Sequence, residues 1–199
     1  MNFANMKLLY MISCIGLGLI ILSPTIFAVA SFPESEKFSE LWILGSNHMA
    51  ESTAFEITAN NPESVFLGVG NHMGELEYYA VFVKFHNQSE PISDYEVGLP
   101  SSSETIFEYR MFLNDNEVWE KNFVFSFEDI SFEDTILQVS KLAINGYDVN
   151  VDKTVAWDDE FGGFYCQLSF ELWIYNPTTS SFQFHNRAVW FWVTVSETL

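Results

Sequence analysis

The sequence predicts an all-β fold, an antiparallel β-sandwich of the immunoglobulin-like kind, preceded by one N-terminal transmembrane or signal helix. Three observations predict it: an uncharged apolar run near the N-terminus, alternation of apolar and polar residues through most of the remainder, and turn sequences between the alternating stretches. Beyond the N-terminal run, no window shows convincing apolar spacing of the helical kind.

The N-terminal run is residues 8–30, LLYMISCIGLGLIILSPTIFAVA, which carry no charge. As a helix it would be about 34 Å long, enough to cross a hydrocarbon core. Lys7 precedes it and Glu34 and Glu36 follow, which favours an N-terminus inside the cell. Two interpretations remain open: a permanent anchor, or a signal peptide cleaved after Ala28-Val29-Ala30.

Under either interpretation, residues 31–199 lie outside the cytoplasm. We predict a cytoplasmic N-terminus (1–7), a transmembrane anchor or signal peptide (8–30), a short stalk (31–37) and an extracytoplasmic β-sandwich domain (38–199). The protein would be a single-pass protein of the cell membrane, or secreted if the segment is cleaved. Cys14 lies in the apolar run and Cys166 far beyond it, so no disulfide is expected within the body.

Strand signals recur along the body. In FYCQLSFELWIY the even-numbered residues from Phe164 to Ile174 are apolar, which predicts a long strand with one buried face. NPTTSS predicts a turn, and FQFHNRAVWFWVTV a returning strand. Shorter strands are predicted around residues 55–59, 65–69, 79–85 and 123–127, and Asn145-Gly146 predicts a type I′ hairpin. Residues 91–104 predict a surface loop or a crossover between sheets.

The body is strongly acidic. All 27 acidic residues and seven of the eight basic residues follow Ala30, so residues 31–199 carry a net charge of −20. Such a surface repels phosphate backbones and anionic lipid headgroups, so nucleic acid is not expected as a partner. No G-x-S-x-G, H-E-x-x-H or C-x-x-C motif is present, and we expect neither an enzyme nor a cofactor.

Two Asn-His-Met tripeptides suggest a metal-handling function. His48-Met49 and His72-Met73 offer imidazole and thioether ligands for Cu(I) or Zn²⁺ if the two segments meet. The alternative is that both are turns, since glycine and asparagine precede each histidine. His86 and His185 each follow a phenylalanine at a strand end, where a structural histidine is expected.

A second metal hypothesis concerns the acidic run WDDE. Asp158, Asp159 and Glu160 offer hard oxygen ligands for Ca²⁺. The run lacks the spacing of a twelve-residue calcium loop, and in so acidic a chain a solvated turn is the alternative.

Aromatic residues facing away from the core suggest a carbohydrate-binding surface. On the predicted C-terminal hairpin, Val189, Phe191, Val193 and Val195 form the inward set, which leaves an outward aromatic set. Such side chains stack on sugar rings or dock a protein partner, unless another layer covers them. The candidate ligand-binding residues are Trp173, Tyr175, Trp190 and Trp192. Asn87-Gln88-Ser89 is a sequon that would allow glycosylation of Asn87.

The strings FSELWILG, FEITANNPESVFLGVGNHMG, YYAVFVKFHNQ, EYRMFL, WEKNFVFSF, FELWIYN and FQFHNRAVWFWV together resemble an uncharacterised archaeal membrane-protein family, domain of unknown function 1616. The resemblance spans nearly all of residues 38–195. It implies a β-rich extracytoplasmic domain tethered by N-terminal membrane helices, without an established activity or assigned site residues. Longer relatives have several membrane helices, whereas this chain has room for one.

The sequence therefore predicts a membrane-anchored, non-enzymatic interaction or structural module of the cell surface. Its partner would be a protein or glycan, reached through a sheet face or end loops. A carbohydrate-binding module and a metal-handling surface protein are the alternatives.

Overall fold

The computed structural model describes residues 3–30, 36–50, 54–160 and 162–196, in two compact units, residues 1–36 and 37–199. The first unit holds one helix, α1 (Phe3–Ala30), whose segment Asn5–Leu22 is long and apolar enough to cross a membrane and equally fits a signal sequence. The N-terminal apolar helix is confirmed. Most of the expected stalk lies outside the described residues.

The second unit, called the body below, is built from strands. They are β1 (Phe38–Leu44), β2 (Ala54–Thr58), β3 (Glu63–His72), β4 (Glu77–His86), β5 (Thr105–Leu113), β6 (Val118–Glu133), β7 (Ile136–Ile144), β8 (Tyr147–Asp158), β9 (Gly163–Asn176) and β10 (Ser181–Ser196). The predicted hairpin at Asn145-Gly146 joins β7 to β8, and both residues have the positive φ of a type I′ turn, 50° and 81°.

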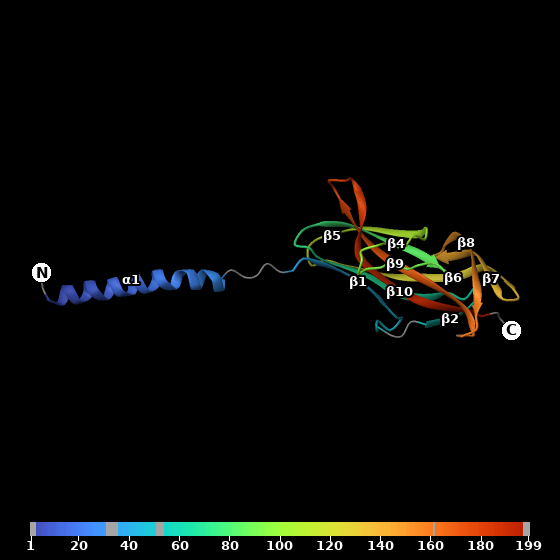
Figure 1. Cartoon of the computed structure of the whole chain (residues 1–199), viewed down its shortest axis with the longest axis horizontal. Coiled ribbons are helices and arrows are strands. Elements are labelled where there is room, and N and C mark those ends of the chain that lie inside the picture. Colours follow the sequence, from blue (N-terminus) through green and yellow to red (C-terminus); the bar gives the residue numbers. More distant parts are fainter. Residues whose placement is uncertain (1–2, 31–35, 51–53, 161, 197–199) are drawn as a thin grey trace. The chain divides into compact units, whose positions relative to one another are not determined.

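The strands form one curled sheet (Figure 1). Its hydrogen-bonded order is β1-β3-β6-β7-β8-β9-β10-β2, with β4 paired to β9 and β5 paired to β4. Neighbours are antiparallel except β10 and β2, which run parallel. A tight turn at residues 114–117 carries the chain from β5 to β6, whereas residues 87–104 connect the adjacent strands β4 and β5. The stretch 91–104 is therefore a surface loop and not a crossover.

The all-β class is confirmed, but the immunoglobulin-like sandwich is not. The two halves of the sheet are hydrogen-bonded to each other through β8 and β9, at Trp157↔Phe164 and Asp158↔Gly163. In an immunoglobulin sheet of order ABED, the outermost strand D precedes its neighbour E in the chain. Here β6 lies beside β3, and the later strands β7 and β8 extend outward from it.

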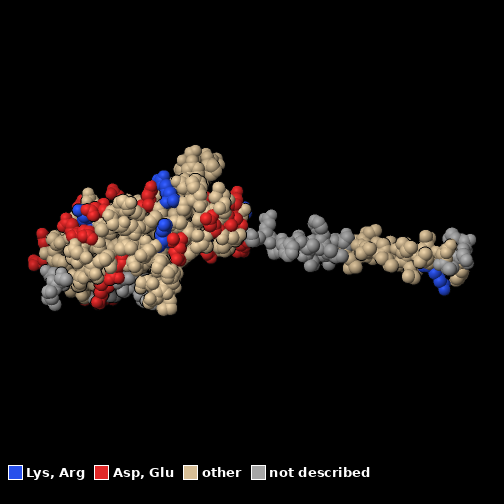
Figure 2. Space-filling view, turned by 180° about the vertical axis from the view of Figure 1, so that it is seen from behind, with Lys and Arg blue, Asp and Glu red and all other residues tan. Residues whose placement is uncertain are grey.

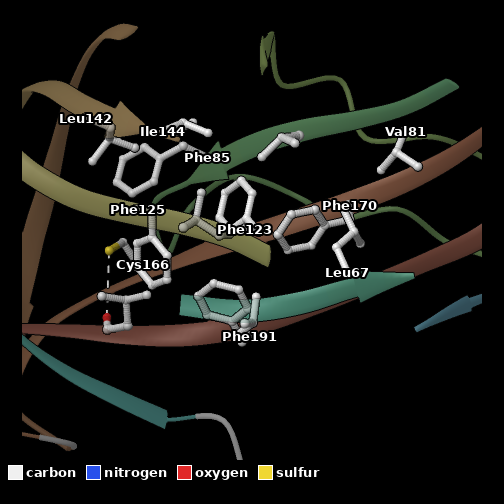
Figure 3. Close-up of a cluster of buried hydrophobic side chains, with 14 of the residues drawn as sticks. Leu67, Val81, Phe85, Phe123, Phe125, Leu142, Ile144, Cys166, Phe170 and Phe191 are labelled. Atoms are coloured by element: carbon white, nitrogen blue, oxygen red, sulfur yellow. Dashed lines mark hydrogen bonds between the residues drawn. The ribbon is translucent and has the colours of Figure 1, made fainter. Parts of the chain in front are cut away.

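The core lies between the two halves of the curl (Figure 3). Phe123 on β6 meets Phe170 on β9 edge-to-face, with ring centroids 4.9 Å apart. Phe125 lies 5.2 Å from Phe191 on β10. The predicted inward sets are confirmed: Cys166, Leu168, Phe170, Leu172 and Val193 are fully buried, Phe191 and Val195 nearly so, and Ile174 and Val189 are partly buried against the core. Burying so many large apolar side chains is the main stabilising term of the body.

Candidate functional site

The outer face of β9, which turns away from the core, is polar and yet buried. Gln167, Ser169 and Glu171 are 1%, 1% and 0% exposed. The alternation in the sequence places these residues on the outer face. It gives no sign that something covers them.

The covering segment is the connection between β4 and β5, residues 90–103, which we call the strap. Its inner side carries serines that bond to Glu171: Ser93 Oγ donates to Glu171 Oε1 over 2.6 Å, and the Ser101 backbone N–H donates to the same oxygen over 2.7 Å. Ser101 Oγ donates to the Pro91 carbonyl over 2.9 Å and so ties the two ends of the strap together.

A buried ion pair lies beneath the strap. Lys84 Nζ lies 2.9 Å from Glu171 Oε2, and the two side chains are 5% and 0% exposed. Lys84 also donates to the Ser101 carbonyl over 2.6 Å, and Trp173 Nε1 donates to Glu171 Oε2 over 3.0 Å. Each charge thus has a counter-ion and further hydrogen bonds, which offset the large desolvation cost of burying it.

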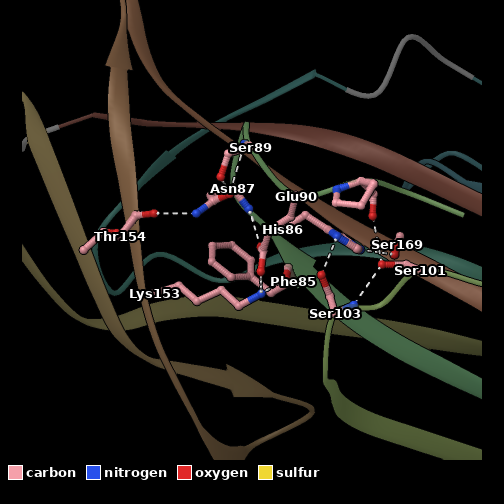
Figure 4. A network of polar contacts seen from close by, with 11 residues as sticks. Phe85, His86, Asn87, Ser89, Glu90, Ser101, Ser103, Lys153, Thr154 and Ser169 are labelled. Carbon is pink, nitrogen blue, oxygen red and sulfur yellow. Dashed lines mark hydrogen bonds and ion pairs between the residues drawn. The ribbon is translucent and has the colours of Figure 1, made fainter.

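His86 forms a second attachment between the strap and β9 (Figure 4). Its Nε2 lies 2.7 Å from Ser169 Oγ and its Nδ1 lies 3.0 Å from Ser103 Oγ. Burial, aided by the nearby positive charge of Lys153, lowers the pKa of His86 to about 4. His86 is therefore neutral at neutral pH, with one ring nitrogen donating and the other accepting. The expected structural role of this histidine is confirmed.

The turn that leads into the strap, and Glu90 at the start of the strap, are bonded to β8 as well. Asn87 Nδ2 donates to the Thr154 carbonyl over 3.1 Å, and Gln88 Nε2 donates to the Ala156 carbonyl over 2.6 Å. Lys153 Nζ lies 2.6 Å from Glu90 Oε1 and donates to the Phe85 carbonyl (Figure 4). Burial opposes the ionisation of Glu90, but the hydrogen bonds from Lys153 and the Asn87 backbone, together with the positive charge of Lys153, outweigh it and lower the pKa of that carboxyl.

The sequon at Asn87 therefore lies in a structured turn. Asn87 is half-buried, and its Oδ1 accepts hydrogen bonds from Ser89 N and Ser89 Oγ at 3.0 and 2.9 Å. Its amide nitrogen, the atom that a glycan would modify, already donates to β8. Glycosylation of Asn87 stays a prediction.

The outer side of the strap carries four exposed apolar side chains, with the acidic Asp94 and Glu96 among them. Ile92, Tyr95, Val97 and Leu99 are 37%, 51%, 69% and 58% exposed. The backbone that carries them is ordered by Asp94, whose N–H donates to the Leu99 carbonyl over 2.8 Å and whose Oδ1 accepts from the backbone of residues 96 and 97. A rigid loop thus holds four exposed apolar side chains.

The predicted aromatic site is divided by the structure. Tyr175 contacts Tyr78 and Phe182, with centroid distances of 5.8 and 5.5 Å, and Trp173 contacts Phe82 at 5.1 Å. These rings are partly buried against one another. Trp190 and Trp192 lie farther along the same face, since their partners in the sheet are Ser169 and Gln167.

The four residues are spread along the strand direction of this face. Trp173 and Gln167 are six residues apart on β9, about 20 Å at the rise of a strand. Trp192 thus lies far from Trp173 along this face, with Trp190 between them, and a ligand-binding role of Trp173, Tyr175, Trp190 and Trp192 stays a prediction. The outward orientation of Trp192, which is 44% exposed, was predicted correctly.

The two Asn-His-Met segments are not brought together. His48 lies in a turn, stacks on Phe66 with a centroid distance of 3.7 Å, and lies 3.2 Å from Glu120 Oε1. His72 ends β3, stacks on Phe38 at 4.7 Å and lies 3.1 Å from Asn116 Oδ1. Phe66 and His72 are six residues apart on one strand, about 20 Å. A metal site shared by His48 and His72 is therefore wrong.

The turn interpretation holds fully for the first segment only. Asn71 belongs to β3, where it is buried and its amide donates to the carbonyls of Glu75 and Leu113, both over 2.8 Å. Tyr79 OH donates to Asn71 Oδ1 over 3.0 Å. The second segment is thus the end of a strand whose asparagine organises the neighbouring turns.

The acidic run lies where β8 ends. The Glu160 backbone N–H donates to Asp158 Oδ1 over 2.9 Å, which is turn chemistry. Within the residues that the structure describes, no group of three His, Cys, Asp or Glu side chains is arranged to hold a metal ion. The Ca²⁺ site at Asp158, Asp159 and Glu160 has no support in this geometry.

Sequence reasoning missed the residues that hold the strap. The available signal was a charged residue inside a strongly apolar strand: Lys84 in YYAVFVKF and Glu171 in LSFELW. Charges at such positions are rarely buried unless they are paired.

A family model described as Domain of unknown function (DUF1616) matches residues 33–139. The chain belongs to this family. The expected resemblance is confirmed, although the DUF1616 match ends within β7, so the hairpin of β9 and β10 lies outside it. No curated protein matches.

Solved structures give only weak likenesses. A beta-glucosidase from Listeria innocua in complex with gluconolactone has a TM-score of 0.44 and 11% identity, covering 84% of this chain but 17% of that one. A CARDB domain from Pyrococcus furiosus in complex with di-metal ions has a TM-score of 0.37 and 10% identity, covering 84% and 95%. The C-terminal domain of Wzt has a TM-score of 0.37 and 8% identity, covering 83% and 81%. At these scores the likenesses carry no conclusion about fold or function.

Proposed function

We propose that this member of the DUF1616 family is a membrane-tethered module of the cell surface that binds a protein partner through the outer side of the strap, without catalysis. The observation that carries the proposal is the combination of an apolar outer side with a firmly bonded inner side. Exposed apolar residues that gather on one ordered loop are a feature of interaction sites.

Rigidity favours binding by such a loop. The strap is bonded to β9, β4 and β8 through Glu171, Lys84, His86 and Lys153, so little conformational entropy is lost when a partner docks on it. Tyr95 is of the residue type that dominates binding energy at protein interfaces. A loop that served only as a connection would need neither the buried ion pair nor the exposed apolar side chains.

The charge of the body restricts the partner. Acidic side chains are spread over the face shown in Figure 2, and Asp94 and Glu96 lie within the strap itself. A partner with an apolar patch bordered by basic residues is complementary to this surface, whereas an acidic partner is repelled.

Site-specific photo-crosslinking in the full-length protein, in its own membrane, tests the proposal. A crosslinker at position 97 is expected to yield one discrete product, and Tyr95→Ser with Leu99→Ser should abolish it. A crosslinker at the exposed position 150 on β8 is the matched control. Equal products from both positions, or a product at 97 that survives the double substitution, would contradict the proposal.

The tether has its own test. Alkaline carbonate extraction of membranes should leave the full-length protein in the pellet, and its intact mass should include residues 1–30. Release into the supernatant with loss of these residues would show a cleaved signal peptide instead. The proposal for the strap survives that outcome, because it depends only on the body.

A further inference from the structure

A groove of about 570 Å³ lies between the turn that precedes the strap and the end of β8. Its lining includes Asn87 and Gln88 from that turn, Trp157 and Asp158 from β8, and Asp159 and Glu160 from the residues that follow β8. The groove is separate from the outer side of the strap, because none of the exposed apolar residues of the strap lines it.

The groove is preformed. Asn87 and Gln88 reach across to β8 and bond to the carbonyls of Thr154 and Ala156, at 3.1 and 2.6 Å, which ties the turn to the strand that carries Trp157. The backbone N–H of Trp157 donates to the Thr135 carbonyl over 2.7 Å. A site whose walls are already fixed binds a ligand with little reorganisation.

Trp157 supplies an aromatic surface within the groove. Its side chain is 43% exposed, and its ring meets Phe164 edge-to-face at 5.2 Å and 83°, which holds the indole in one orientation. An aromatic residue of this size, kept partly in solvent between polar walls, is suited to the apolar C–H face of a sugar ring.

The polar walls decide the class of sugar. The three carboxylates accept hydrogen bonds and do not donate, so they match the hydroxyl hydrogens of a saccharide. Lysine and arginine are absent from the residues that line the groove, within the part of the chain that the structure describes. Sugars that carry carboxylate, sulfate or phosphate groups are therefore repelled.

We propose that this groove binds a saccharide without anionic groups, with a sugar ring stacked on Trp157 and its hydroxyls bonded to Asp159 and Glu160. The site differs from the aromatic set expected from the sequence, none of whose four residues lines the groove. The proposal is independent of the protein partner on the strap.

Saturation-transfer NMR on the purified full-length protein, made in a host without N-glycosylation, tests the inference. The probes are methyl glucoside, methyl mannoside, N-acetylglucosamine, their short oligomers, and glucuronic acid. At least one neutral series should receive saturation and glucuronic acid none. The absence of transfer to every neutral probe would overturn the proposal, as would transfer to glucuronic acid of equal strength.

Matched variants locate the binding. Trp157→Leu should weaken binding about tenfold or more, whereas Trp192→Leu, at a tryptophan of nearly equal exposure, should leave it unchanged. Asp159→Asn with Glu160→Gln should also weaken binding. The control with the same change of charge outside the groove, Glu104→Gln with Glu133→Gln, should not.

Each variant should keep the wild-type melting temperature. If Trp157→Leu fails to fold, the carboxylate pair and its control still decide the question. Equal weakening by both pairs of acid substitutions would mean that net charge, and not the groove, governs the response, and would overturn the site.

Discussion

The residues in the middle of β9 are buried on both faces of the strand, but different interactions stabilise the two faces. On the inner face, Cys166, Leu168 and Phe170 join an apolar core, where contacts are non-directional and burial raises the pKa of the Cys166 thiol. On the outer face, Ser169 and Glu171 lie in a polar layer that depends on named partners in the strap and β4.

The two faces should therefore respond differently to substitution. When a core side chain is truncated, the protein loses stability in proportion to the volume of the cavity left behind, because the neighbouring side chains relax only partly. A substitution in the polar layer lowers stability by another route. Removal of one partner leaves a charge or a hydrogen-bond donor buried without compensation. Gln167 illustrates the difficulty, since its Nε2 is buried without a hydrogen-bond partner among the described residues.

The largest expected effect comes from breaking the ion pair. Lys84→Met should lower the free energy of unfolding by about 3–5 kcal/mol, because the Glu171 carboxylate stays buried without its counter-ion. Chemical denaturation of the full chain in detergent measures the loss, and amide exchange should show faster opening of the strap at Ser101, whose N–H donates to Glu171.

Two controls sharpen this test. Phe170→Ala should lower stability by a similar amount, about 3–5 kcal/mol, while the strap stays protected under native conditions. The double variant Lys84→Met with Glu171→Leu should be more stable than Lys84→Met alone, because no unpaired charge remains. A Lys84→Met protein as stable as wild type would remove the distinction between the two faces.

The second effect depends on pH. Because burial lowers the pKa of His86 from 6.5 to about 4, the unfolded chain binds a proton more readily than the folded chain between these values. Stability from neutral His86 is fully present above pH 6.5 and is lost as the pH falls toward 4, on the order of 3 kcal/mol in all.

His86→Gln separates this contribution from others. The variant should show a shallower fall in unfolding free energy between pH 6.5 and 4. His185 contributes in the same direction, since burial and the nearby Arg187 lower its pKa, so some slope should remain. Identical slopes in wild type and variant would argue against a buried neutral His86.

A third test concerns the outer face of β3, which is covered by a tryptophan ring and not by a loop. On β3, Gly68 allows the Trp42 ring to lie directly on the backbone, and an added Cβ would be 2.1 Å from Trp42 Cε2. Gly68→Ala should therefore lower stability by about 1–3 kcal/mol. Trp42→Leu in the same chain should restore part of the loss, and an unaffected Gly68→Ala variant would refute the close contact.

The smallest effect is expected on the outer side of the strap. Val97→Ser should change stability by less than about 0.5 kcal/mol, because the side chain is 69% exposed. Ser93→Ala, on the inner side, should cost about 1–3 kcal/mol through the lost donor to Glu171. Thermal unfolding of both variants would show whether the two sides of the strap differ in this way.

Much of the sheet could be predicted from the sequence, because alternation is a local property. The inward residues of β9 and β10, and the turn at Asn145-Gly146, follow from residue pattern and turn chemistry. The order of strands does not, because it depends on which distant segments meet. Pattern alone therefore did not reveal that β6 adjoins β3 or that the sheet continues through β8 and β9.

The candidate sites were harder to predict for the same reason. Alternation places Glu171 on the outer face but cannot show that residues 90–103 cover it. The two Asn-His-Met segments have the same sequence but lie far apart. The antiparallel pairing of β1 with β3 places the segment that follows β1 at the opposite end of β3 from His72. Trp157 and Asn87 line one groove although 70 positions separate them in the chain.

The parallel pairing of β2 with β10 affects the order in which the strands can pair during synthesis. Ala54 is aligned with Trp192, about 140 residues later. Synthesis delivers the N-terminus first, so β2 has no partner for its ladder until the end of β10 has emerged. Until then β2 lacks its ladder, and removal of residues 192–196 would leave β2 without its partner and the first residues of β9 without their β10 neighbour.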